Sequence, residues 1–138
     1  MAGSEVFVDT AFWIAAARKP DARHERAKEL SADLIRRHPK LVISDLVLAE
    51  VITLVLKRDG HEAALKIMDF LDKNTTLLFV DKSVLEDAKT LLRRYWGPRK
   101  GLSVCDATSY ILMQSRGIED MYSFDSGFDG LPGVIRIS

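Results

Sequence analysis

Residues 41–50, Leu-Val-Ile-Ser-Asp-Leu-Val-Leu-Ala-Glu, predict a buried strand that runs directly into a helix. The apolar run 41–43 is typical of a strand that is covered on both faces. Ser44 follows it, and its hydroxyl can cap a helix that begins at Asp45 and is stopped by Gly60. A strand followed at once by a helix is the repeating unit of α/β folds with parallel sheets.

The same unit recurs along the whole chain, which has no repeat, linker or low-complexity tract. Strands are expected at residues 5–8, 41–43, 77–80, 121–124 and 134–137. Helices are expected at residues 10–17, 21–37, 45–58, 61–72, 83–96 and 103–116, with Asp21 as a cap of the second and Ser83 opening a capping box in the fifth. This alternation predicts one α/β domain over residues 1–138, with a parallel sheet that helices cover on both faces.

Composition fits an ordinary folded domain with a mixed surface. The chain has 138 residues, is 47% hydrophobic, and carries 20 basic and 20 acidic residues. The net charge of zero excludes the strongly basic class of nucleic-acid-binding domains. If four acids are reserved for a site, the rest of the chain has an excess of four positive charges, so a basic rim around an acidic pocket is possible.

The single cysteine and the lengths of the apolar stretches are informative about the cellular location of the protein. Cys105 has no partner for a disulfide, which suits a reducing cytoplasm. It is expected to be a small packing residue rather than a nucleophile, because no histidine lies in a suitable context. We expect no signal peptide, and the longest apolar stretch, 46–56, is broken by Glu50 and too short to span a bilayer.

Four acidic residues lie where a charge is hard to accommodate. Asp9 ends a strand, Glu50 lies inside an apolar helix, Asp106 opens another helix, and Asp125 ends a later strand. A buried carboxylate is costly unless something pairs with it, and no Lys or Arg is adjacent to any of the four in sequence. If they converge, a divalent metal is the simplest counter-charge, and the chain would be a metal-dependent phosphodiester-cleaving enzyme.

Three of these acids, and others, have an alternative explanation. The helix around Glu50 is apolar on nearly all sides, which predicts that it is buried, so Glu50 either faces a pocket, which we favour, or pairs with a cation. Asp106 can complete a capping box with Ser103. Asp45 and Asp81 also end strands, but they suit the first turn of a helix and a plain turn. Asp125 and Asp129 lie in a turn-rich segment, where turn chemistry is the alternative for both and the better interpretation for Asp129.

Four short motifs in order give the chain a resemblance to PIN-domain nucleases and, in length, to the VapC-type toxins of type II toxin–antitoxin pairs. They are residues 7–10 (Phe-Val-Asp-Thr), 44–51 (Ser-Asp-Leu-Val-Leu-Ala-Glu-Val), 102–107 (Leu-Ser-Val-Cys-Asp-Ala) and 123–128 (Ser-Phe-Asp-Ser-Gly-Phe). The resemblance covers essentially the whole chain. It implies a three-layer α/β/α fold with a mostly parallel five-stranded sheet, the first strand beside the fourth and the third at an edge.

The resemblance also implies a site and partners. Asp9 and Asp106 would be the core ligands of Mg²⁺ or Mn²⁺, and Glu50 and Asp125 would complete the acidic cluster. Two hydroxyl side chains would support ligands or phosphate, namely Thr10 and Ser126. The substrate would be RNA, and the chain would form a homodimer and bind a cognate antitoxin, with residues 45–72 as a contact surface.

Contacts to the RNA are less specific in the sequence. The candidate phosphate contacts are Arg18, Lys19, Arg93, Arg94, Arg99 and Lys100, for which an ordinary solvated surface is an equal explanation. Tyr95 and Trp96 can stack on bases, although packing at a helix end explains them better. Phe12 and Trp13 face either the core or a partner.

Three other functions share parts of the pattern. A metal-free PIN-like scaffold that binds RNA or protein is opposed by intact acids at all four positions. A phospho-accepting receiver domain would use Asp81, but such domains resemble one another in an acidic pair after the first strand, where this chain has Asp9-Thr10, and in a late Lys, where it has Ser126. A hydrolase of small phosphate esters would resemble its class in a second Asp two residues after the first, where this chain has Ala11.

Overall fold

The structure, a computed structural model, describes residues 4–95 and 101–138. The strands are β1 (Glu5–Val8), β2 (Lys40–Ser44), β3 (Thr75–Leu78), β4 (Asp120–Tyr122) and β5 (Ile135–Ile137). The helices are α1 (Thr10–Ala17), α2 (His24–Arg37), α3 (Asp45–Asp59), α4 (His61–Asn74), α5 (Lys82–Tyr95) and α6 (Val104–Arg116), with a short 3₁₀ helix η1 (Ser126–Phe128). The α/β class expected from the alternation is confirmed.

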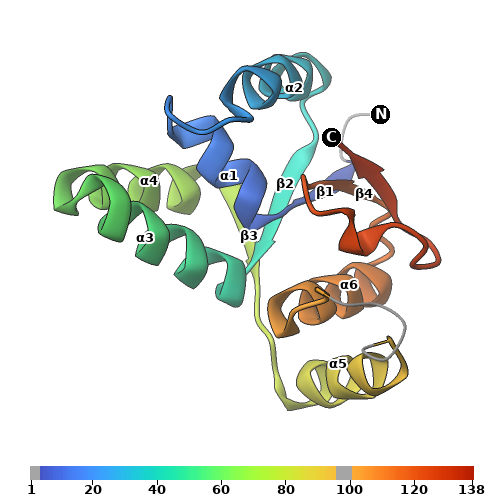
Figure 1. Cartoon of the computed structure of the whole chain (residues 1–138). Helices are drawn as coiled ribbons and strands as arrows, with labels where there is room; N and C mark the ends of the chain where they lie inside the picture. The colour runs from blue at the N-terminus through green and yellow to red at the C-terminus, as the bar shows by residue number, and fades with distance from the viewer. Residues whose placement is uncertain (1–3, 96–100) are drawn as a thin grey trace.

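The five strands form one sheet in the order β3-β2-β1-β4-β5. Every neighbouring pair is parallel, so the sheet is wholly rather than mostly parallel. Helices α1 to α4 cover one face and α5 and α6 the other, which gives the expected three layers (Figure 1). Strand order reverses between β1 and β4, and ligands of open α/β sheets bind outside the carboxyl ends of strands at such a reversal.

Helix α3 packs on the sheet through a narrow stripe. Val47, Val51 and Val55 are its buried residues, at the four-residue spacing of one helix face. Leu56 is 47% exposed and Glu50 is exposed, so the prediction of a helix buried on nearly all sides is wrong. The reason is that α1 and α4 cover only part of its surface (Figure 1). No helix in the described part of the chain is both long and apolar enough to cross a membrane.

Several element ends differ from the sequence prediction. Helix α2 begins at His24 because Asp21 accepts a hydrogen bond from the Arg23 backbone N–H (2.8 Å) and forms a turn ahead of the helix. Helix α5 is capped by Asp81, whose Oδ1 accepts from the Val84 N–H at 2.9 Å, and not by a box at Ser83. Strand β3 begins and ends two residues earlier than expected, and β4 ends at Tyr122 rather than 124.

Candidate active site

All four predicted acids line one open pocket at the carboxyl ends of β1 and β4. The pocket has a volume of about 520 Å³. Its lining comprises Asp9, Thr10, Ala11, Ile14, Asp21, Arg23, Glu50, Leu54, Arg58, Gly101, Ser103, Asp106, Phe124 and Asp125. The topology therefore brings together residues that are up to 116 positions apart in the chain, from Asp9 to Asp125.

Asp9 is the buried centre of this cluster. It precedes α1 as its N-cap, yet its carboxylate makes no capping hydrogen bond and accepts one from Ser123 Oγ at 2.9 Å instead. Asp9 is 4% exposed. Burial raises the pKa of the carboxyl from 3.8 to about 6, and the nearby carboxylates of Asp125 and Glu50 act in the same direction. A group so placed favours a cation beside it.

Asp106 combines the two roles that the sequence left open. Its backbone N–H donates to Ser103 Oγ and its Oδ2 accepts from the Ser103 N–H, both at 3.0 Å, so the capping box is complete. The residue is 6% exposed and still lines the pocket. Burial raises its pKa to about 7, with further contributions from the carboxylates of Asp9 and Asp125. Capping fixes the carboxylate in place and leaves Oδ1 for the site.

Glu50 faces the pocket, as the sequence favoured, but it is exposed rather than buried. Its Oε1 accepts a hydrogen bond from Thr10 Oγ1 at 2.8 Å, which ties the middle of α3 to the start of α1. The supporting role expected of Thr10 is consistent with this contact. Because Glu50 is exposed, it needs no cation to offset a cost of burial. Its carboxylate is available to groups that bind in the pocket.

Asp125 lies three residues beyond the end of β4 and is half-buried. Its backbone N–H donates to Ser123 Oγ (3.0 Å), and its Oδ1 accepts from the Gly127 N–H (2.8 Å). A Cβ at Gly127 would lie 3.0 Å from Asp125 Oδ1, so glycine leaves room for that carboxylate. Ser126, expected to support ligands, is exposed and lies outside the pocket lining.

Ser123 is a site residue that the sequence analysis missed. It is fully buried, and its hydroxyl donates to Asp9 and accepts from the Asp125 backbone, which joins the ends of β1 and β4. Its only signal in the sequence is a polar residue at the end of a strand, which many turns share.

The remaining acids near strand ends have structural roles. Asp45 Oδ1 accepts from the backbone N–H groups of Leu46 and Val80, both at 3.0 Å, and thereby holds β2 and the segment after β3 together. Asp81 caps α5. Asp129 is paired with Arg136 at 2.8 Å, in line with a turn function.

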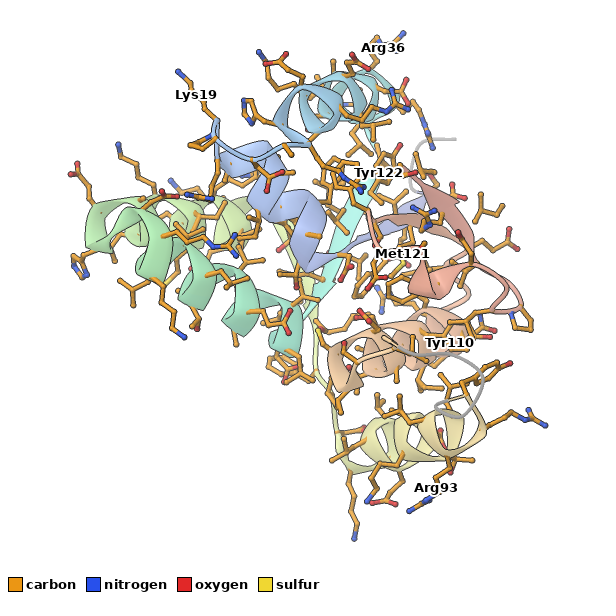
Figure 2. All side chains as sticks on the ribbon, in the orientation of Figure 1. Lys19, Arg36, Arg93, Tyr110, Met121 and Tyr122 are labelled. Atoms are coloured by element: carbon orange, nitrogen blue, oxygen red, sulfur yellow. The ribbon has the colours of Figure 1, made fainter. Side chains whose placement is uncertain are left out.

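The basic residues expected to bind phosphate lie outside the pocket lining wherever the structure describes them. Arg18 pairs with Asp59 at 2.7 Å and lies outside the pocket lining. Figure 2 shows Lys19 and Arg93 on the outside of the molecule. Arg94 is exposed in the last turn of α5, and Tyr95 packs against the core. The predicted contacts Trp96, Arg99 and Lys100 lie outside the described residues.

The two aromatic residues of α1 pack in the hydrophobic core. Phe12 is 2% exposed and contacts the rings of Tyr122 and Phe124, at 5.5 and 5.7 Å between centroids. Trp13 is 6% exposed, and its indole N–H donates to the Val8 carbonyl at 3.2 Å. The core alternative for both residues is therefore confirmed.

Cys105 does not supply a nucleophile. The thiol is buried, and burial raises its pKa far above the usual range. The carboxylates of Glu50, Asp9 and Asp106 raise it further, because they oppose a second negative charge nearby. The thiolate that nucleophilic chemistry requires is thus suppressed.

The donor set fits a hard divalent cation. The pocket offers carboxylate and hydroxyl oxygens, and neither histidine nor cysteine is in its lining. No three His, Cys, Asp or Glu side chains in residues 4–95 and 101–138 form a ready-made cage. Mg²⁺ does not require one, because it keeps several waters and typically takes one or two carboxylates together with substrate phosphates. The raised pKa values of Asp9 and Asp106 are the electrostatic signature that such a cation would relieve.

Comparison with known proteins agrees with this site. The family model of the PIN domain matches residues 6–134. The chain belongs to the PIN-domain family. This PIN domain is 36% identical over 124 residues to the 23S rRNA-specific endonuclease VapC20 of Mycobacterium tuberculosis, across 89% of this chain and 91% of that protein.

Solved structures give the same result. The crystal structure of Mycobacterium tuberculosis VapC20, described as a sarcin–ricin loop cleaving toxin, matches with a TM-score of 0.81 and 35% identity, over 94% of this chain and 96% of that one. VapBC-1 from nontypeable Haemophilus influenzae matches in fold, with a TM-score of 0.73, 12% identity and 97% coverage of both chains. The receiver-domain alternative is not supported, since β3 is an edge strand and Asp81 is occupied as a cap.

Proposed function

We propose that this PIN domain is a divalent-metal-dependent endoribonuclease that hydrolyses RNA phosphodiester bonds. The observation that carries the proposal is the convergence of Asp9, Glu50, Asp106 and Asp125 in one open pocket, with the first and third buried and carrying raised pKa values. The similarity to VapC20, named as a 23S rRNA-specific endonuclease, supports RNA as the substrate.

In this proposal Asp9 and Asp106 hold the cation, Mg²⁺ or Mn²⁺, and Asp125 completes the negative field around it. A bound divalent cation lowers the pKa of an attacking water and stabilises the charge that develops on the phosphate. Ser123 keeps Asp9 oriented through its hydrogen bond to Oδ2. The capping box does the same for Asp106 through Oδ2. Both carboxylates are thus preorganised, which avoids rearrangement during the reaction.

Glu50 has a different task, because it is exposed to the water in the pocket. Thr10 donates a hydrogen bond to its Oε1 at 2.8 Å, and the side chain lines the pocket. We assign the Glu50 carboxylate as the group that orients the attacking water and accepts its proton. Glutamate is one of the side chains that act as general bases when they lie within hydrogen-bond reach of the proton to be removed.

We further propose that the chain is the toxin of a toxin–antitoxin pair in the cytoplasm, as a homodimer that its antitoxin inhibits. The support is the similarity to VapC20, described as a toxin, and the exposed apolar side chains on α3 and α4: Leu56, Leu65 and Phe70. Light scattering of the purified chain tests the homodimer, and co-expression with any small protein whose gene adjoins this one tests the antitoxin. A monomer that binds no such protein would remove this part of the proposal.

The nuclease proposal is tested by cleavage of mixed ribosomal and transfer RNA with Mg²⁺, with Mn²⁺ and with EDTA. The variant Asp9→Asn removes a proposed metal ligand, and Asp81→Asn is the matched control, since it changes an acid that serves only as a helix cap. We expect metal-dependent cleavage that is lost in EDTA and in Asp9→Asn and kept in Asp81→Asn. Cleavage that persists in Asp9→Asn would refute the site, and RNA binding without cleavage by the wild type would indicate a scaffold.

A further inference from the structure

Two arginines that the proposed chemistry leaves unused line the acidic pocket. They are Arg58, in the last turn of α3, and Arg23, just before α2. Arginines outside the pocket, such as Arg18 and Arg136, are held by carboxylates. Within the described residues, neither Arg58 nor Arg23 forms an ion pair with a carboxylate.

Helix geometry places Arg58 at a defined distance from the acids. Glu50, Leu54 and Arg58 recur every four residues and all line the pocket, so one face of α3 forms its wall. The eight residues between Glu50 and Arg58 correspond to about 12 Å along the helix. The acid nearest to Arg58 in sequence, Asp59, is already taken by Arg18, with contacts of 2.7 and 3.3 Å. Arg58 is therefore an uncommitted cation at the far end of the same pocket.

Arg23 is held at the rim by contacts that leave its charge available. Its guanidinium lies 5.1 Å from the centroid of the Phe124 ring, and its Nη1 donates to the Phe124 carbonyl at 3.4 Å. Among residues 4–95 and 101–138 its other guanidinium N–H groups meet no acceptor, so they can donate to a ligand. Asp21 also lines this rim, but its Oδ1 is engaged by the Arg23 backbone N–H.

We propose that Arg58 and Arg23 bind RNA phosphates adjacent to the scissile one, so that the strand runs from the acidic cluster along the groove between α1 and α3. The inference rests on the nuclease function proposed above. Carboxylates alone would repel an RNA strand, and cations beyond them supply the attraction that places one phosphate at the acids. Arginine suits this task because its planar fork matches phosphate oxygens. Both are positioning residues, since neither is placed at the reacting atoms.

Arg58 gives the cleaner test, because its side chain is exposed and makes no hydrogen bond within the described residues, so we expect its loss to leave the fold intact. In Arg58→Gln we expect KM for RNA to rise about tenfold with kcat changed by less than about twofold, since the lost contact is made equally in the ground and transition states. Arg58→Lys should recover most of the affinity, because a point charge still attracts phosphate. Lys57→Gln is the control: an exposed neighbour on α3 that lies outside the pocket lining.

Salt dependence separates a phosphate contact from a structural effect. In an Asp9→Asn background, which prevents cleavage, the slope of log binding constant against log salt concentration should fall by about 0.7 for each arginine removed from a single-stranded contact. A melting temperature for each variant reports folding. If Arg58→Gln matches Lys57→Gln in both KM and slope, the inference is overturned. If the wild type cleaves no RNA with any metal, the nuclease proposal fails. The salt dependence of RNA binding still tests whether the two arginines contact phosphates.

Discussion

Replacing Asp9 with asparagine should stabilise the metal-free protein at neutral pH. The carboxyl of Asp9 has a pKa of about 6 in the folded protein, against 3.8 ordinarily. Below pH 3.8 the group is protonated in both states and imposes no penalty. As the pH rises towards 6 the unfolded chain releases its proton first, so stability is lost, by about 3 kcal/mol in total. Asparagine has the same shape, can still accept from Ser123 Oγ and carries no charge.

The size of the effect depends on pH in a way that identifies its cause. Urea unfolding in EDTA should show Asp9→Asn more stable than the wild type by about 3 kcal/mol at pH 7.5 and by only about 1 kcal/mol at pH 4.5. Asp87→Asn, which changes an exposed acid on α5, is the matched control. Adding Mg²⁺ should raise the stability of the wild type alone and narrow the gap, since binding to the folded state stabilises it.

An Asp9→Asn variant that is less stable than the wild type at pH 7.5 in EDTA would refute this prediction. A stability difference of the same size at pH 4.5 and pH 7.5 would refute it as well. Either result would mean that burial and the neighbouring carboxylates do not raise the pKa of Asp9. The pocket would then have no electrostatic need for a cation beside Asp9.

Further predictions concern the residues around the cluster. Ser123→Ala, which removes a hydroxyl held between two site residues, should lower kcat about tenfold and stability by about 1 kcal/mol, measured by RNA cleavage and urea unfolding. Thr10→Val should lower kcat because Glu50 loses its hydrogen bond, and Thr10→Ser should recover it; equal activity in both variants would show that the bond is dispensable. Asp81→Ala should lower the free energy of unfolding by about 1 kcal/mol through the lost cap, with RNA cleavage by the folded protein unchanged. Cys105 should resist iodoacetamide at mildly alkaline pH in the native state and react in denaturing urea, as followed by mass spectrometry, because burial and the carboxylates raise the pKa of its thiol; rapid native labelling would contradict that environment.

The fold was predictable from the sequence because each unit carries its own boundary signals. Residues 41–50 contain an apolar run, a capping serine and the start of a helix, and all three are observed: Ser44 Oγ accepts from the Val47 N–H at 3.1 Å. The predicted start of a helix was wrong where two neighbouring residues could both act as its N-cap. Asp81 and Ser83 both suit an N-cap, and only the tertiary position of the preceding strand decides between them.

Glu50 shows a correct conclusion drawn from a wrong premise. Apolar neighbours on both sides predicted a buried helix, and from that a pocket. The helix is in fact half exposed, because Leu46 and Leu48 pack only partly against their neighbours. Periodicity reports which residues are apolar and says little about how far other helices extend to cover them.

Ser123 and the two pocket arginines could not be found in the sequence for a different reason. The contact between Ser123 and Asp9 spans 114 residues and depends on β1 lying beside β4. Arg58 is one of several basic residues on exposed helix faces, and it is set apart by its place in the pocket lining and by the pairing of Asp59 with Arg18. These roles depend on the order of the strands in the sheet and on which charged residues already form ion pairs. Local residue spacing predicts neither of the two.

Strand-end acids illustrate how one local pattern divides into two roles. Asp45 and Asp81 follow strands towards one edge of the sheet, where backbone N–H groups of the next segment take up their oxygens. Asp9 follows the central strand, beside the reversal of strand order, and its carboxylate accepts a hydrogen bond from Ser123 instead of capping α1. Asp106 lies between these cases, since its capping bond uses Oδ2 and holds Oδ1 at the pocket. The energy that capping contributes to α6 therefore also offsets part of the cost of burying a site carboxylate, so that one hydrogen bond serves both the helix and the site.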